Sequence, residues 1–135
     1  MEEPDVELTG RRVLLIEDEA LVMMLLEDTL AETGCEIAGM ASRVDEALEK
    51  ANSLSFDVAV LDVNLNGRQT FDVARCIRER GIPFVFATGY GAASLMAGFQ
   101  DVPILQKPFQ QRDLEGALRL ALTGRGEGGQ TSTAV

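Results

Sequence analysis

Short apolar runs alternate with longer amphipathic stretches along most of this 135-residue chain. Each run has four or five residues and lacks the strict apolar–polar alternation of a strand with one wet face. Continuous runs of this kind are typical of strands buried on both faces. They are Val13–Ile16, Ile37–Ala41, Val58–Leu61, Phe84–Ala87 and a weaker run at Val102–Leu105. Strands separated by helix-length segments predict a parallel sheet, because parallel neighbours need crossover connections.

The segments between the runs predict the helices. These are expected over Ala20–Thr33, Val44–Asn52, Thr70–Arg80, Gly91–Gln100 and Arg112–Leu122. The fourth of them should be short, because its glycines disfavour helix. We therefore expect one α/β domain over residues 11–122, with a five-stranded parallel sheet and helices on both faces. Residues 1–10 form an acidic N-terminal segment, and the glycine-rich residues 123–135 are expected to be a disordered tail, because they offer little to pack.

Composition excludes several kinds of chemistry. The chain has no histidine, which removes Ser-His-Asp and Cys-His catalysis and His-ligated zinc. Its two cysteines show no pairing pattern, so we expect reduced thiols. The 22 acidic residues outnumber the 12 basic ones, for a net charge of −10, which disfavours direct binding to nucleic acid or to an anionic membrane. No apolar run approaches the ~20 residues that span a bilayer, and no secretory signal is evident, so we expect a cytoplasmic location.

Polar side chains follow the predicted strands at the point where each strand ends. They are Glu17, Asp18 and Glu19 after the first run, Asp62 after the third, Thr88 after the fourth and Lys107 after the last. Parallel sheets bind ligands beyond the carboxyl ends of their strands, so these side chains are expected to converge at one edge.

Several carboxylates at one edge need a cation. Two carboxylates ~4 Å apart repel each other by about 4 kcal/mol at an effective dielectric constant of 20. Lys107 offers one positive charge, and a Mg²⁺ ion with oxygen ligands offers two. Such an ion would also favour phosphorylation of Asp62, because it neutralises the oxygens of an arriving phosphoryl group. Thr88 and Lys107 would then bind other phosphoryl oxygens.

These segments resemble the receiver domain of two-component response regulators, from about Arg11 to Leu122. The motifs that carry the resemblance are Val13-Leu-Leu-Ile-Glu-Asp-Glu19, Val60-Leu-Asp62, Phe86-Ala-Thr-Gly89 and Lys107-Pro-Phe109. The resemblance implies the flavodoxin-like receiver fold with strand order 2-1-3-4-5. It makes Asp62 the phosphoacceptor, and it assigns Mg²⁺ to Glu17, Asp18, Asp62 and the backbone carbonyl of Asn64. It assigns the phosphoryl group to Thr88 and Lys107, and it implies a cis bond before Pro108.

Pro83-Phe-Val-Phe-Ala-Thr-Gly-Tyr90 resembles a narrower subgroup, the single-domain receivers of alphaproteobacterial stress signalling. The chain departs from most receivers at the switch position three residues before the lysine, where Ile104 replaces an aromatic residue. Tyr90 either replaces that residue as the moving ring, working with Thr88, or only covers the site. Asn66 also stands where many receivers have proline.

The sequence therefore predicts a single-domain response regulator, which is a phosphoacceptor with autophosphatase activity rather than an enzyme. Having no histidine, it would receive its phosphoryl group from a histidine kinase or a histidine phosphotransfer protein. It would signal through a downstream protein, as a monomer or a weak dimer. The apolar first helix either packs on two sides or docks a kinase helix. Two alternatives stay open: a receiver-fold binding module that works without phosphorylation, and the receiver domain of a hybrid kinase.

Overall fold

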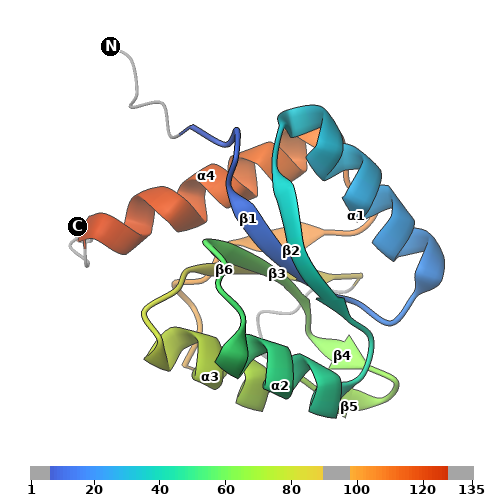
Figure 1. Ribbon diagram of the computed structural model, residues 1–135. Helices are drawn as coiled ribbons and strands as arrows, with labels where there is room; N and C mark the ends of the chain where they lie inside the picture. Colours follow the sequence, from blue (N-terminus) through green and yellow to red (C-terminus); the bar gives the residue numbers. More distant parts are fainter. Residues whose placement is uncertain (1–6, 90–97, 128–135) are drawn as a thin grey trace.

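A five-stranded parallel sheet forms the centre of the molecule (Figure 1). The computed structural model describes residues 7–89 and 98–127. The sheet strands are β1 (Arg12–Ile16), β2 (Glu36–Ala41), β3 (Val58–Asp62), β6 (Phe84–Thr88) and β7 (Ile104–Gln106). Their order is β2-β1-β3-β6-β7. Two further strands, β4 (Asn64–Leu65) and β5 (Arg68–Gln69), pair only with each other in a small antiparallel hairpin, so the main sheet has the expected 2-1-3-4-5 order.

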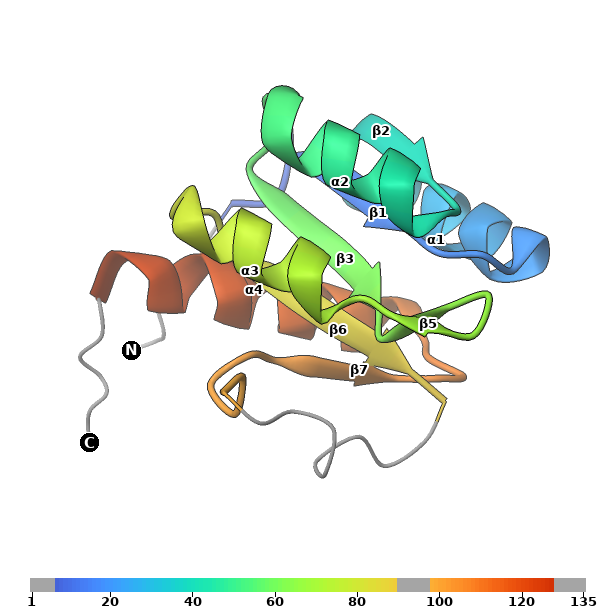
Figure 2. The ribbon, with the colours of Figure 1, turned by 90° about the horizontal axis from the view of Figure 1, so that it is seen from below.

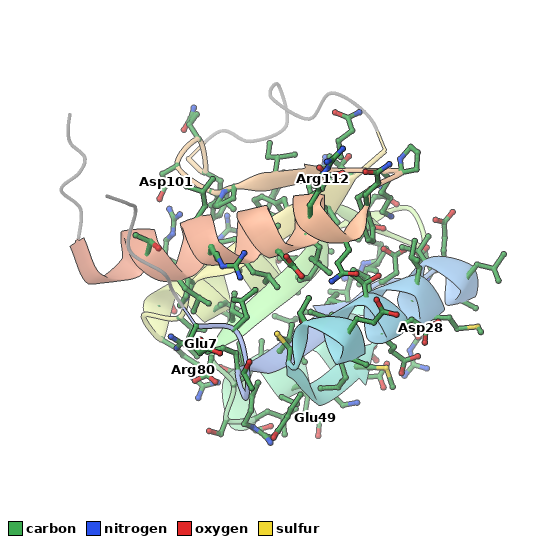
Figure 3. The ribbon with its side chains drawn as sticks, turned by 90° about the horizontal axis from the view of Figure 1, so that it is seen from above. Glu7, Asp28, Glu49, Arg80, Asp101 and Arg112 are labelled. Carbon is green, nitrogen blue, oxygen red and sulfur yellow. The ribbon has the colours of Figure 1, made fainter. Side chains whose placement is uncertain are left out.

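Helices cover both faces of the sheet, as predicted. The helix α1 (Ala20–Thr33) has the predicted bounds. The helix α2 (Val44–Ser53) is one residue longer than predicted, and α3 (Phe71–Glu79) is one residue shorter at each end. The last helix, α4, covers Gln111–Glu127. Figure 2 shows α2 and α3 on one face of the sheet, and Figure 3 shows α1 and α4 together on the opposite face.

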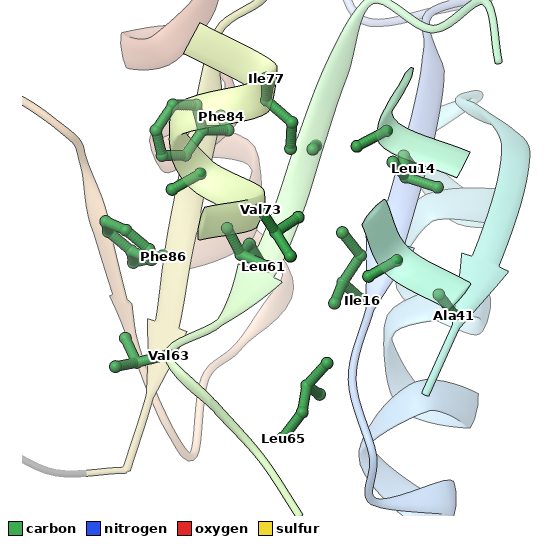
Figure 4. Packing of buried hydrophobic residues seen from close by; sticks show 14 of the residues in the cluster. Leu14, Ile16, Ala41, Leu61, Val63, Leu65, Val73, Ile77, Phe84 and Phe86 are labelled. Carbon is green, nitrogen blue, oxygen red and sulfur yellow. The ribbon is translucent and has the colours of Figure 1, made fainter. Parts of the chain in front are cut away.

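The strands send successive side chains to opposite faces, and each face has its own core. In β1, Leu14 and Ile16 pack with residues of α2 and α3, whereas Val13 and Leu15 pack with residues of α1 and α4. All four side chains are fully buried. Figure 4 shows the first of these cores, with Leu14, Ile16 and Phe86 among its members. Burial on both faces explains why the strands read as continuous apolar runs.

The two ends of the predicted domain extend further than expected. Leu8, within the predicted acidic segment, is only 3 % exposed and packs in the core beside α1 and α4. The few apolar residues of this segment are too widely scattered among acids to form a helix or strand pattern, so the sequence could not place Leu8 inside. The helix α4 continues to Glu127 rather than ending at Leu122, so the first part of the predicted tail is helical. A helix already held by packed turns gains a backbone hydrogen bond with each added residue, which offsets the poor helix propensity of Gly124.

The segment between β6 and β7 was predicted to contain a short helix over Gly91–Gln100. Positions 90–97 lie outside the described residues, and positions 98–100 form turns rather than helix. The strand β7 begins at Ile104 rather than Val102, because Pro103 has no N–H for the strand ladder. Val102 instead donates its N–H to the carbonyl of Phe99, at 3.0 Å. No helix within the described residues has the length and apolar character needed to cross a membrane.

Candidate functional site

Three carboxylates meet at the carboxyl ends of two neighbouring strands. Glu17 and Asp18 directly follow β1, and Asp62 is the last residue of β3. The two strands pair in register, with Ile16 opposite Leu61, so the residues that follow them emerge side by side. One oxygen from each of Glu17, Asp18 and Asp62 lies within 4.8 Å of the other two. The sequence therefore predicted this cluster correctly.

Lys107 is the cation in direct contact with the cluster among the described residues. Its Nζ atom lies 2.9 Å from Glu17 Oε1 and 3.1 Å from Asp62 Oδ2, with Glu19 Oε1 farther away at 3.9 Å. The lysine follows β7, and its backbone N–H donates to the carbonyl of Thr88 at 2.8 Å, which ties the ends of β6 and β7 together. The predicted cis bond between Lys107 and Pro108 is present.

Burial makes the cluster electrostatically unusual. The side chain of Glu17 is fully buried. Loss of hydration raises the pKa of Glu17 to about 7, and the negative charge of Asp62 adds to this effect, although Lys107 opposes it. Burial by itself lowers the pKa of Lys107, but the contacts with Glu17 and Asp62 outweigh burial and raise it. One ammonium group therefore forms ion pairs with two carboxylates in a largely buried site.

The residues present fit a hard divalent cation. Glu17 Oε1 is buried, and among the described residues its close polar neighbour is the ammonium group of Lys107, at 2.9 Å. A buried carboxylate oxygen in this state is costly to ionise, and a cation would relieve that cost. The donors are oxygens only, which suits Mg²⁺ better than zinc or copper. In the described part of the chain this is the group of acidic residues close enough together to hold a metal ion.

The loop after Asp62 is fixed by its own hydrogen bonds. Asn64 donates its backbone N–H to Asp62 Oδ1 at 3.1 Å. Asn66 and Gly67 form the two-residue turn of the β4–β5 hairpin, with φ values of 52° and 84°. The backbone N–H of Asn66 donates to Asp18 Oδ2 at 2.9 Å, and its side-chain Nδ2 donates to the Ser42 carbonyl at 3.1 Å. The hairpin thus holds one carboxylate of the cluster and is itself attached to the end of β2.

A pocket of about 480 Å³ opens over the cluster. Its lining includes the candidate ligands Asp18, Asp62 and Asn64, the candidate phosphoryl-binding residues Thr88 and Lys107, and also Glu19, Val63, Gln69 and Gly89. Asp62 is 8 % exposed and Thr88 is 5 % exposed, so both reach the pocket from well-packed strand ends. Most of the residues that line the pocket are polar or charged.

The three switch candidates have different positions. Thr88 lines the pocket, as described. Ile104, 43 % exposed, does not line it: this residue borders a groove of about 700 Å³ between β7 and α4, together with Leu120. Tyr90 lies outside the described residues. Ile104, which stands where most receivers have an aromatic switch residue, therefore lies outside the pocket over the carboxylate cluster.

Two residues of the site were not predicted. The sequence indicates only that Asn66 departs from the usual proline and that a helix begins at Thr70. The structure adds that the hydroxyl of Thr70 donates to the carbonyl of Asp62, at 2.6 Å. The Asn66-Gly67 pair is a known signal for a tight hairpin and could have predicted the β4–β5 turn. The role of Thr70 has no such signal, because its hydrogen bonds join residues that only the folded loop brings together.

Comparison with known proteins agrees with this geometry. A family model described as the response regulator receiver domain matches residues 13–119. The transcriptional regulatory protein PdtaR of Mycobacterium tuberculosis is 38% identical over 117 residues, which cover 84% of this chain and 57% of PdtaR. The chain thus spans little more than half the length of that relative. The chemotaxis protein CheY of Thermotoga maritima is 28% identical over 116 residues, covering 81% of this chain and 95% of CheY.

Solved structures give the same result. The solution structure of SdrG from Sphingomonas melonis superposes with a TM-score of 0.76 at 39% sequence identity, covering 87% of this chain and 99% of SdrG. A BeF₃-activated conformation of SdrG superposes with a TM-score of 0.72, covering 84% of this chain and 98% of that structure.

Proposed function

This chain belongs to the response regulator receiver domain family, and on that basis we propose that Asp62 accepts a phosphoryl group in a magnesium-dependent reaction. The observation that carries the proposal is the meeting of Glu17, Asp18, Asp62 and Lys107 at one edge of the sheet, with one oxygen from each of the three acids within 4.8 Å of the other two. So many charges at one sheet edge are costly for stability, and phosphoryl transfer gives each of them a role.

Each residue has one task in this proposal. A carboxylate oxygen of Asp62 attacks phosphorus, a P–O bond forms, and the bond from phosphorus to the donor's imidazole nitrogen breaks. Glu17, Asp18, Asp62 and the Asn64 carbonyl would hold Mg²⁺, which supplies charge neutralisation for the phosphoryl oxygens. Lys107 moves its ion pair from Asp62 to a phosphoryl oxygen, and the hydroxyl of Thr88 donates to another. Water attack on phosphorus would later break the bond from phosphorus to the Asp62 oxygen, which releases inorganic phosphate and returns the carboxylate. This hydrolysis is the expected autophosphatase activity.

The given sequence has no histidine, so a phosphohistidine that donates to Asp62 would lie outside it. We propose a histidine kinase or a histidine phosphotransfer protein, and a downstream protein as the target of the phosphorylated state. A cytoplasmic location and a role in stress signalling are part of the same proposal. The role in stress signalling rests on the resemblance of Pro83–Tyr90 to one receiver subgroup.

The exposed face of α1 is the proposed docking surface for the donor. Leu21, Met24 and Leu25 are 79, 56 and 44 % exposed, and α1 begins two residues after Asp18. Apolar side chains in such positions are typical of a protein interface. We expect Met24→Lys to slow phosphorylation by a protein donor but not by phosphoramidate, which needs no docking. An equal loss with both donors would contradict a docking role.

Phosphoramidate with Mg²⁺ tests the central proposal. Intact-mass spectrometry should detect one added phosphate on the wild-type chain, and none on Asp62→Asn. Asp28→Asn is the matched control, since it removes the same charge from an exposed position on α1 and should leave phosphorylation unchanged. If the wild-type chain never gains phosphate, or if Asp62→Asn keeps its cellular activity, the alternative of a phosphorylation-independent binding module is favoured instead.

A further inference from the structure

Thr70 occupies a position where threonine usually stabilises a helix, but its hydroxyl does something else. It is the N-cap residue of α3, and it makes no side-chain capping hydrogen bond. An N-cap threonine normally accepts a hydrogen bond from a backbone N–H in the first turn of its helix. Here the hydroxyl turns away from the helix and donates to the backbone carbonyl of Asp62, at 2.6 Å. The hydroxyl of Thr70 thus binds the backbone of Asp62 rather than capping its own helix.

Thr70 holds both peptide groups that flank Val63. Its hydroxyl binds the Asp62 carbonyl, which fixes the peptide between Asp62 and Val63. Its backbone N–H donates to the Val63 carbonyl at 2.9 Å, and the hydroxyl oxygen lies 3.1 Å from that same carbonyl. The second of these peptides also carries the N–H of Asn64, which donates to Asp62 Oδ1. A continuous path of hydrogen bonds therefore leads from Thr70 to the carboxylate of Asp62.

The surroundings make this path rigid. Thr70 is 0 % exposed, so water cannot replace its hydroxyl as the donor to the Asp62 carbonyl. The carbonyl of Thr70 accepts the N–H of Ala74 at 3.0 Å, which anchors the residue to the first turn of α3. On the other side, the N–H of Val63 reaches the carbonyl of Ala87 on β6 at 3.4 Å. The loop after Asp62 is thereby held between α3 and the sheet.

We infer that Thr70 is a positioning residue for the phosphoacceptor: its hydroxyl fixes the backbone of Asp62, and hence the direction of the Asp62 carboxylate, by linking the start of α3 to the end of β3. The inference rests on the proposed function, and it adds to that function a residue that touches neither the phosphoryl group nor the metal. A reacting carboxylate that loses its fixed direction is a slower nucleophile, because fewer encounters have the required in-line geometry.

The test compares three substitutions. Thr70→Val keeps the branched shape and removes the hydroxyl, while Thr70→Ser keeps the hydroxyl and removes the methyl group. Thr29→Val is the matched control, since Thr29 is also buried, at 8 % exposure, and lies in the second half of α1, remote from the loop. We expect Thr70→Val to slow phosphorylation by phosphoramidate about tenfold, and the other two variants to stay within about twofold of wild type.

Two measurements separate positioning from simple loss of stability. In metal-free protein, the amide resonances of Val63 and Asn64 should shift in Thr70→Val and not in Thr29→Val, even where both variants lower the melting temperature. In the wild-type chain, the hydroxyl proton of Thr70 should exchange slowly enough to be detected by NMR. Both measurements work without phosphorylation, so they test the inference even if the wild-type chain is never phosphorylated and the proposed function fails.

Several results would overturn the inference. One is a phosphorylation rate of Thr70→Val close to that of wild type, despite a lower melting temperature. Another is a loss in Thr70→Ser as large as in Thr70→Val, since shape rather than the hydroxyl would then matter. If Thr70→Val fails to fold, the inference is tested by the phosphorylation rate of Thr70→Ser and by exchange of the Thr70 hydroxyl proton in the wild-type chain. A rapidly exchanging hydroxyl proton contradicts the inference.

Discussion

Replacing Lys107 with methionine should separate the charge of this lysine from its bulk. Methionine fills a similar volume, so the packing of the lysine chain is largely kept. The substitution removes the ion pairs at 2.9 Å to Glu17 and at 3.1 Å to Asp62. In metal-free protein the carboxylates then face one another without the cation that now contacts them.

The expected loss of stability can be worked from these distances. Two carboxylate oxygens at the 4.8 Å limit of the cluster repel by roughly 3 kcal/mol at an effective dielectric constant of 20. Breaking a buried ion pair while leaving one charge behind costs about 3–5 kcal/mol. The pKa of Glu17 is already about 7, so this group can bind a proton at neutral pH and relieve part of the repulsion. We therefore expect the lower end, about 3 kcal/mol in the free energy of unfolding.

Urea unfolding in EDTA and in saturating magnesium measures this loss. Magnesium should stabilise Lys107→Met more than it stabilises wild type, because no ammonium group competes with the ion for Glu17 and Asp62. Lys50→Met is the control: Lys50 forms a half-exposed pair with Glu46 at 3.4 Å, and surface pairs contribute about 1 kcal/mol or less. The reasoning is refuted if Lys107→Met in EDTA loses no more than the control, or if magnesium stabilises both proteins equally.

Three further predictions concern other parts of the molecule. Phe86→Ala should lower the free energy of unfolding by about 3–5 kcal/mol in urea titrations, because this fully buried ring packs against three others. Asn66→Pro should weaken magnesium binding in calorimetry, since proline has no N–H for Asp18 and cannot adopt a φ of 52°. Asn66→Gly keeps the N–H and can adopt this φ, so it should bind magnesium nearly as well as wild type. Burial raises the pKa of Cys35 and of Cys76, so their thiolates form only at higher pH. Alkylation by iodoacetamide at mildly alkaline pH should therefore be slower than for free cysteine, and equal rates would contradict this.

The main sheet was predictable because each strand is buried on both faces. A run such as Val58–Leu61 is typical of a strand buried on both faces, and the strand ends then place Glu17, Asp62 and Lys107 together. The bounds of strands and helices were predicted less accurately where proline or glycine interrupts the pattern. Pro103 shortened the last strand, and α4 passed through Gly124 although glycine disfavours helix.

The hydrogen bonds that orient the site were not predictable. The sequence places Thr70 only as the first residue of a predicted helix, and the folded loop shows that its hydroxyl reaches the Asp62 carbonyl. The same is true of Asn66, whose N–H meets Asp18 across 48 positions of the chain. Residue types at strand ends can be assigned from sequence, whereas partners brought together by a loop depend on its conformation.

The two cores on either side of the sheet also restrict the length of β3. Its residues alternate between the helical layers, with Ala59 and Leu61 on one side and Val58 and Val60 on the other. Inserting one residue would send every later side chain of the strand to the wrong layer. It would also carry Asp62 one pleat away from Asp18 and Lys107. Evolution can therefore exchange the apolar residues of this strand far more freely than it can add or delete one.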